Sequence, residues 1–222
     1  DYIWNDTQTE ATFSVVGMSV PVSWVNADGQ TQSANFLIPN KNECKGCHSY
    51  NGQFVPIGPK ARPLNSNYPY STGTMNQLEK WTAMGYLTQA PTNLETAPHT
   101  PLWNDPTSGT LDQRARAYLD TNCGHCHNAK GPANSSGLSL SWLETNAFAM
   151  GICKPPIAAG QGSGGWLYSI VPGKPEESIL IYRMNSTVLD VAMPELGRSV
   201  IHAEGLQLIS DWIAAMEPVN CQ

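Results

Sequence analysis

The residues with the most specific chemistry in this chain form one five-residue pattern that occurs twice. Residues 44–48 read CKGCH and residues 123–127 read CGHCH, so each copy places two cysteines three positions apart directly before a histidine. This spacing is typical of covalent c-type haem attachment, in which two thiols form thioethers with the porphyrin vinyl groups and the histidine binds iron. The pattern predicts two covalently bound haem c groups. Their predicted attachment residues are Cys44, Cys47, Cys123 and Cys126, and their predicted iron ligands are His48 and His127.

Two other uses of paired cysteines compete with haem attachment. A CxxC pair also occurs in zinc sites, but a zinc module usually joins its pairs over short spacings, and here the copies are in different halves of the chain. Cysteines three positions apart in a helical turn are poorly placed to form a disulfide with each other. Haem attachment is therefore the favoured interpretation.

A low-spin electron-transfer haem needs a further axial ligand, usually methionine or histidine. For the second haem the sequence favours Met193, because a following proline and glycine indicate a loop from which the thioether can face the iron; Met184 is the alternative. For the first haem Met75 and Met84 are metal-ligand candidates. His99, Lys60, a residue from the other half of the chain, or no ligand at all also remain open.

Two cysteines lie outside the motifs, Cys153 and Cys221. Thioether attachment takes place outside the bacterial cytoplasm, and an oxidising compartment would allow these two thiols to pair. We therefore expect a disulfide between them, with free thiols as the alternative, and a periplasmic or extracellular location.

The first residue is Asp1, which leads us to expect a processed protein or a domain of a longer chain.

Composition restricts the classes of partner. Only 14% of the 222 residues are charged, against 19 glycines and 17 prolines, which is typical of a loop-rich secreted protein. The net charge is −6 and no basic stretch occurs, so we expect neither nucleic acid nor an anionic membrane surface as a partner. No run of about 18 apolar residues is present, so no membrane span is expected.

Local patterns predict the elements that carry the motifs. Residues 11–38 alternate apolar and polar side chains around Asp28-Gly29, which predicts a strand hairpin. Asn40 or Asn42 is the expected cap of a short helix that ends in the first motif. Two further capping boxes, Thr74 with Gln77 and Thr110 with Gln113, predict helices, and the second of these leads into the second motif. Further helices are expected at 176–184 and 203–216, and residues 88–109 are expected to form a linker.

With these elements in place, the chain resembles the bacterial dihaem c-type cytochromes built from class I cytochrome c modules. In the first half the matching segments are NECKGCHSYNGQFVPIGPKARPLN and NQLEKW; in the second they are RARAYLDTNCGHCHN, SILIYRM, MPELGR and LISDWI. The resemblance covers most of residues 38–216. It implies mainly α-helical haem modules, electron transfer and a location outside the cytoplasm.

The expected fold is mainly α: two cytochrome c-like haem modules, residues 1–100 and 101–222, with a small N-terminal β hairpin and long loops. The expected function is transfer of single electrons between redox protein partners. The alternative from another class is a dihaem peroxidase in which the first haem has an open site. Peroxidase chemistry needs a distal acid or base, and no histidine or glutamate in the first half is evidently placed for it. A five-coordinate gas-binding haem is a further alternative.

Overall fold

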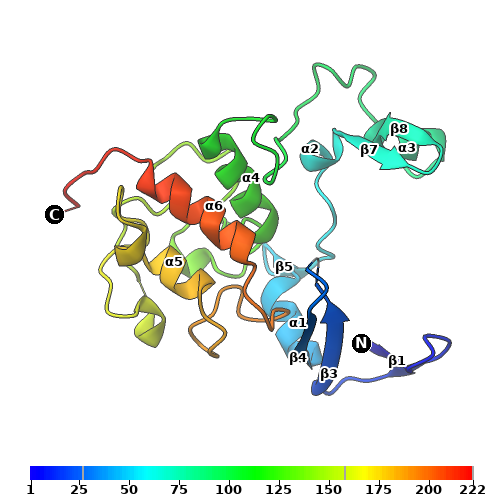
Figure 1. Ribbon diagram of the computed structural model, residues 1–222, viewed down its shortest axis with the longest axis horizontal. Coiled ribbons are helices and arrows are strands. Elements are labelled where there is room, and N and C mark those ends of the chain that lie inside the picture. Colours follow the sequence, from blue (N-terminus) through cyan, green and yellow to red (C-terminus); the bar gives the residue numbers. More distant parts are fainter. Residues whose placement is uncertain (27, 158, 222) are drawn as a thin grey trace.

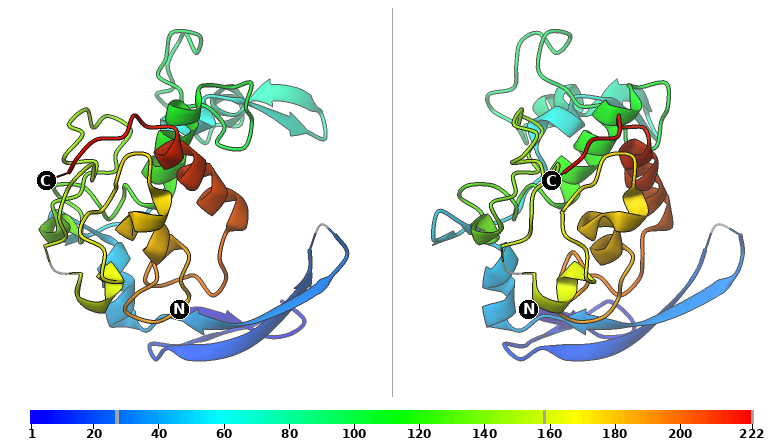
Figure 2. Two further views of the ribbon diagram at one scale, coloured as in Figure 1. Left: turned by 60° about the vertical axis from the view of Figure 1, so that its left-hand side comes forward. Right: turned by 90° about the vertical axis from the view of Figure 1, so that its left-hand side faces the viewer.

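The structure is a computed structural model and describes residues 1–26, 28–157 and 159–221. Its N-terminal part is built from antiparallel strand pairs, each of which is a separate two-stranded sheet. The pairs are β1 (Tyr2–Trp4) with β2 (Ala11–Phe13), β3 (Met18–Val25) with β4 (Thr31–Ile38), β5 (Ser49–Tyr50) with β6 (Gln53–Phe54), and β7 (Asn67–Tyr70) with β8 (Gly73–Asn76). The β3–β4 ribbon confirms the hairpin that the alternating pattern predicted. The ribbon lies beside α1 in Figure 1, and Figure 2 shows its far end reaching beyond the helices.

The described helices are short. They are α1 (Lys41–Cys47), α2 (Ala61–Leu64), α3 (Gln77–Ala83), α4 (Leu111–Asn122), α5 (Ile179–Met184) and α6 (Ala203–Ala214), with 3-10 turns η1 (Asn134–Ser136), η2 (Gly160–Ser163) and η3 (Pro175–Glu177). The capping boxes of Asn40 with Glu43 and of Thr110 with Gln113 are formed. The predicted cap at Thr74 is wrong, because Thr74 pairs in β8 and Asn76 caps α3 instead.

The mainly α fold predicted from the sequence is wrong. The chain is 26% helical and 17% strand, with six short helices and small antiparallel sheets in the part that is described. The reason is composition: 19 glycines and 17 prolines interrupt the helical pattern, so most of the chain between helices forms turns and irregular loops. Strand pairs account for most of the regular structure before residue 77.

The main hydrophobic core belongs to the second half of the chain. Here α4 and α6 cross, with α5 alongside (Figure 1), and the buried apolar side chains meet between them. This core consists of Ala115, Tyr118, Leu119, Leu140, Met150, Ile170, Met184, Leu208, Ile209, Trp212 and Ile213. In the first half only Leu78 and Ala97 are buried hydrophobic residues among those described. The second half therefore supplies most of the hydrophobic stabilisation.

A buried carboxylate joins the first half to this core. The side chain of Asp120, in the last turns of α4, is 2% exposed and lies 2.7 Å from Lys60 Nζ. Arg62 Nη2 lies 3.5 Å from the other carboxylate oxygen, Oδ2. The backbone N–H of Trp142 donates over 2.9 Å to Oδ1, the oxygen that Lys60 contacts. Lys60, which the sequence offered as an axial ligand, is thus held in an ion pair with the other half of the chain.

The remaining cysteines form the expected disulfide. The Sγ atoms of Cys153 and Cys221 are 2.02 Å apart, and the bond ties the segment before η2 to the C-terminal end of the described chain. None of the helices in the described ranges is long and apolar enough to cross a membrane.

Candidate functional site

The first motif is placed at the C-terminal end of α1. Cys44 and Cys47 are one helical turn apart in α1, so their thiols lie on the same side of the helix, and His48 is the C-cap. The ring nitrogen Nδ1 of His48 lies 3.2 Å from the carbonyl oxygen of Val55. The backbone N–H of Val55 in turn donates to the His48 carbonyl over 3.1 Å. His48 is therefore fixed by both its backbone and its ring.

The β5–β6 hairpin brings Val55 to the histidine. Its two-residue turn is Asn51-Gly52, where both residues have positive φ angles, 51° and 73°. This is the geometry of a type I′ turn, which Asn-Gly favours because both residues tolerate left-handed backbone. Val55 is a functional residue that the motif itself does not indicate, although the Asn-Gly dipeptide is a strong hairpin signal.

The second motif follows α4 directly. Cys123 is the C-cap of α4, and the chain continues in a turn in which the N–H of His127 donates to the Cys123 carbonyl over 2.9 Å. Nδ1 of His127 lies 3.2 Å from the hydroxyl oxygen of Ser136, in the 3-10 turn η1. Gly131 is needed where the loop returns, because a Cβ there would collide with the carbonyl oxygen of Cys126. Ser136 is therefore a second residue that the sequence did not indicate.

The two motifs lie next to each other. The thiols of Cys47 and Cys126 share a hydrogen bond. The loops that follow the motifs also meet: the N–H of Asn51 donates to the Lys130 carbonyl over 2.8 Å, and Lys130 Nζ lies 5.8 Å from the centre of the Tyr50 ring. Residues far apart in sequence thus form one site with a cysteine of each motif at its centre.

The surroundings of the site shift the pKa values of its thiols and of His127 in different directions. The hydrogen bond from Cys126 is the main cause that lowers the pKa of the Cys47 thiol to about 6, and the same bond raises the pKa of Cys126. Burial raises the pKa of Cys123 to about 12. Burial, and to a smaller extent the charge of Arg183, lower the pKa of His127 to about 4. At neutral pH His127 is therefore uncharged, the form in which imidazole binds a metal.

The loop that carries Met193 is close to both motifs. The N–H of Met193 donates to the carbonyl of Arg183 over 3.1 Å, which ties the loop to α5. Arg183 interacts electrostatically with His127, and Glu195 interacts with Cys47 and Cys126. The loop therefore borders the site.

The other methionine candidates have different surroundings. Met184, the alternative for the second haem, is buried in the hydrophobic core. Met75 lies in β8, and Met84 is an exposed C-cap of α3. Both belong to the β7–β8–α3 unit, which is apart from α1 in all the views of Figures 1 and 2. The structure does not bring them to the first motif, and His99 is exposed.

A cavity of about 480 Å³ opens beside the site. It lies between Leu37 of β4, Glu43 of α1, Arg183 of α5 and the loop that carries Glu195 and Leu196. Its volume is in the range of about 300–1,000 Å³ that is common for cofactor and ligand sites. It is therefore bordered by the first motif helix on one side and by the Met193 loop on the other.

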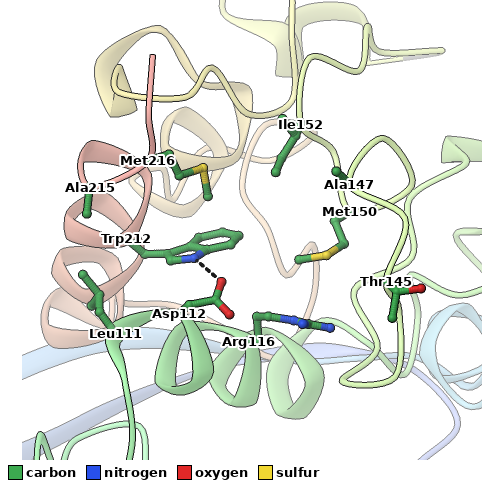
Figure 3. A pocket seen from close by; sticks show the side chains of 10 residues that line it. All are labelled: Leu111, Asp112, Arg116, Thr145, Ala147, Met150, Ile152, Trp212, Ala215 and Met216. Atoms are coloured by element: carbon green, nitrogen blue, oxygen red, sulfur yellow. Dashed lines mark hydrogen bonds between the residues drawn. The ribbon is translucent and has the colours of Figure 1, made fainter. Parts of the chain in front are cut away.

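A second cavity, of about 330 Å³, is formed by the other end of α4 together with α6 (Figure 3). Trp212, Met150 and Met216 line it, and the indole N–H of Trp212 donates to Asp112 over 2.8 Å. No motif residue lines either cavity, but the cavity of about 480 Å³ is bordered by Glu43, the residue before Cys44, whereas this one lies at the end of α4 opposite to Cys123. We therefore assign the candidate site to the motifs and the cavity beside them.

The donor set fits haem better than a structural zinc ion. Within the described ranges no three His, Cys, Asp or Glu side chains are grouped to hold a metal ion. A structural zinc ion needs four such ligands, whereas haem iron takes four from the porphyrin and needs only axial ligands from the protein. Each motif histidine has its Nδ1 next to an oxygen, which leaves Nε2 as the atom for iron.

Comparisons of this chain with protein-family models, with curated proteins and with solved structures find no match.

Proposed function

We propose that the protein is a dihaem c-type cytochrome that transfers single electrons between redox partner proteins. The observation that carries the proposal is the pairing of two complete CxxCH motifs in one site, each with a histidine whose Nδ1 is next to an oxygen. A zinc module or a disulfide scaffold does not require this arrangement.

The chain's own residues have distinct roles in this proposal. Cys44 and Cys47 would attach one haem and Cys123 and Cys126 the other, with His48 and His127 as proximal ligands. Met193 would be a further ligand for the second iron. Its loop supports this role, because Glu195 of the same loop interacts electrostatically with Cys47 and Cys126. The bound groups supply one-electron redox chemistry, and the protein sets their potentials through ligands, burial and hydrogen bonds.

Contact between the motifs supports electron exchange within the molecule. Because a thiol of the first motif touches a thiol of the second, the residues that would attach the two haems lie side by side. The buried ion pairs of Asp120 with Lys60 and Arg62 would keep that spacing constant. A close and fixed spacing is what a molecule needs to pass electrons internally.

Location and partners are part of the proposal. A periplasmic or extracellular location is supported by the disulfide between Cys153 and Cys221 and by the thioether chemistry itself. The net charge of −6 favours a redox partner with a basic surface, since opposite charges speed encounter.

One observation favours the peroxidase as a second candidate. Met75 and Met84 lie apart from α1, so neither would serve as a ligand of the first haem, as a peroxidase with an open site requires. The same haem would then need an acid or base on its open side.

Mass spectrometry tests the cofactor claim. Protein matured in an oxidising compartment should carry two covalently bound haems, and the variant with Cys123→Ala and Cys126→Ala should carry one. The matched variant with Cys153→Ser and Cys221→Ser should still carry two, because those cysteines are outside the motifs. A wild-type mass without haem, or with zinc, would contradict the proposal.

Stopped-flow kinetics separates the two candidate functions. We expect the reduced protein to be reoxidised rapidly by a small basic cytochrome, and more slowly as salt rises, because salt screens charges beyond about 10 Å. Steady turnover of peroxide at an enzymatic rate, on the order of 1 to 1,000 per second, would instead assign the peroxidase.

A further inference from the structure

The hydrogen bonds around Ser136 determine which nitrogen of His127 carries a proton. The Ser136 hydroxyl donates to the carbonyl of Ala133 over 2.7 Å. A serine hydroxyl has only one proton, so towards every other neighbour it can act only as an acceptor. The backbone N–H of Leu138 donates to the same oxygen over 3.2 Å.

His127 must therefore be the donor in its contact with Ser136. Nδ1 of the imidazole lies 3.2 Å from the Ser136 oxygen, and that oxygen can only accept there. The proton of the neutral imidazole is then on Nδ1, and the lone pair is on Nε2. By accepting this hydrogen bond, Ser136 of η1 leaves the lone pair of Nε2 available to bind a metal ion.

The first motif reaches the same tautomer by a different route. The partner of His48 is the carbonyl oxygen of Val55, which can only accept a hydrogen bond. A backbone carbonyl is not altered by side-chain substitution, whereas a serine hydroxyl is. The two histidines therefore donate to different kinds of acceptor. Of the two hydrogen bonds, only that of His127 depends on a side chain.

We infer that Ser136 is a positioning residue that orients His127 and raises its strength as an iron ligand. The inference rests on the proposed function. Hydrogen bonding at the outer nitrogen of a metal-bound histidine fixes its ring plane and raises its basicity. A more basic histidine stabilises ferric iron, so loss of the bond should raise the reduction potential of that one haem.

The experiment compares Ser136→Ala with Ser135→Ala in the two-haem protein. Ser135 is the exposed neighbour in the same turn and serves as the matched control. In Ser136→Ala one of the two reduction potentials should rise, and the other should stay at its wild-type value. Ser135→Ala should leave both unchanged, and Ser136→Thr, which keeps a hydroxyl, should restore the shifted potential.

A second measurement separates positioning from a merely structural role. In the reduced protein the His127 Nδ1 proton should exchange with solvent about fivefold faster in Ser136→Ala, the factor expected for loss of one ordinary hydrogen bond. A lower thermal stability with unchanged potentials and unchanged exchange would overturn the inference and assign Ser136 to the turn alone. If the wild-type protein bound no haem, the proposed function would fail first, and mass spectrometry distinguishes that result.

Discussion

At the scale of single residues, the four motif cysteines are not chemically equivalent. Cys47 and Cys126 share a hydrogen bond that lowers the pKa of Cys47 to about 6, whereas burial raises the pKa of Cys123 to about 12. The thiolate is the reactive form of cysteine. Reactivity in the haem-free chain should therefore concentrate at Cys47.

We expect iodoacetamide to label Cys47 first in haem-free protein at pH 6. About half of a thiol with that pKa is ionised there, against about one part in a thousand at the ordinary value of 9.0. The lower basicity of the thiolate offsets part of this gain, so the net acceleration should be on the order of tenfold. Peptide mapping by mass spectrometry gives the rate at each cysteine.

Cys126→Ala provides the control for this labelling experiment. It removes the main cause of the lowered pKa, so labelling of Cys47 at pH 6 should slow towards the rate of an ordinary thiol. Equal labelling rates at Cys47 and Cys123 in the unmodified sequence would contradict the assigned environments.

At the scale of elements, α4 both contributes to the hydrophobic core and positions the second motif. It packs Ala115, Tyr118 and Leu119 into the core, and its last turn carries Asp120 and leads directly into the second motif. Because Asp120 binds Lys60 and Arg62 across the halves, α4 also determines where the segment after the first motif lies. The position of one motif relative to the other thus depends on a carboxylate three residues before Cys123.

Asp120→Ala should lower the free energy of unfolding by about 3 kcal/mol, because it leaves two partly buried cations without their partner. This is at the lower end of the usual range for a buried pair, since the Lys60 side chain is 35% exposed. Urea unfolding followed by tryptophan fluorescence measures the change.

The exposed ion pair between Lys174 and Glu177 is the matched control for Asp120. Glu177→Gln should change the free energy of unfolding by less than about 1 kcal/mol, as is usual for a surface pair. Equal effects of the two substitutions would show that Asp120 does not join the halves.

At the scale of the whole molecule, stability is distributed unevenly. The buried core lies in the second half, whereas the strand pairs of the first half leave Tyr2, Trp4, Phe13 and Val25 more than half exposed. Isolated two-stranded hairpins are only marginally stable in water. The disulfide between Cys153 and Cys221 therefore reinforces the half that already holds the molecule together.

Replacing both disulfide cysteines by serine should reduce the free energy of unfolding by about 2–4 kcal/mol, as expected when a long loop is released in the unfolded chain. The two cysteines are 68 residues apart in sequence. Calorimetry should show the lower melting temperature, and the haem content should not change. An unchanged melting temperature would mean that the bond adds nothing to native stability.

Part of this architecture follows from short sequence patterns. The capping box of Thr110, the β3–β4 hairpin and the terminal helix were predicted, because each depends on residues within a few positions of one another. For the first motif helix the prediction left Asn40 and Asn42 as alternative caps, and the cap is Asn40. The prediction of a mainly α fold was wrong. It followed the resemblance to helical haem modules, whereas the glycines and prolines restrict the helices to short segments and strand pairs form much of the first half.

The sequence by itself determined the two CxxCH motifs and the hypothesis of haem attachment, since both depend on five adjacent residues. Only the tertiary structure decided that Cys47 meets Cys126, that Val55 and Ser136 hold the two histidines, and that Met75 and Met84 lie elsewhere. These contacts arise where loops return after a turn or where Asp120 binds cations from the other half. They depend on burial and pairing over long separations, which no local pattern of residues records.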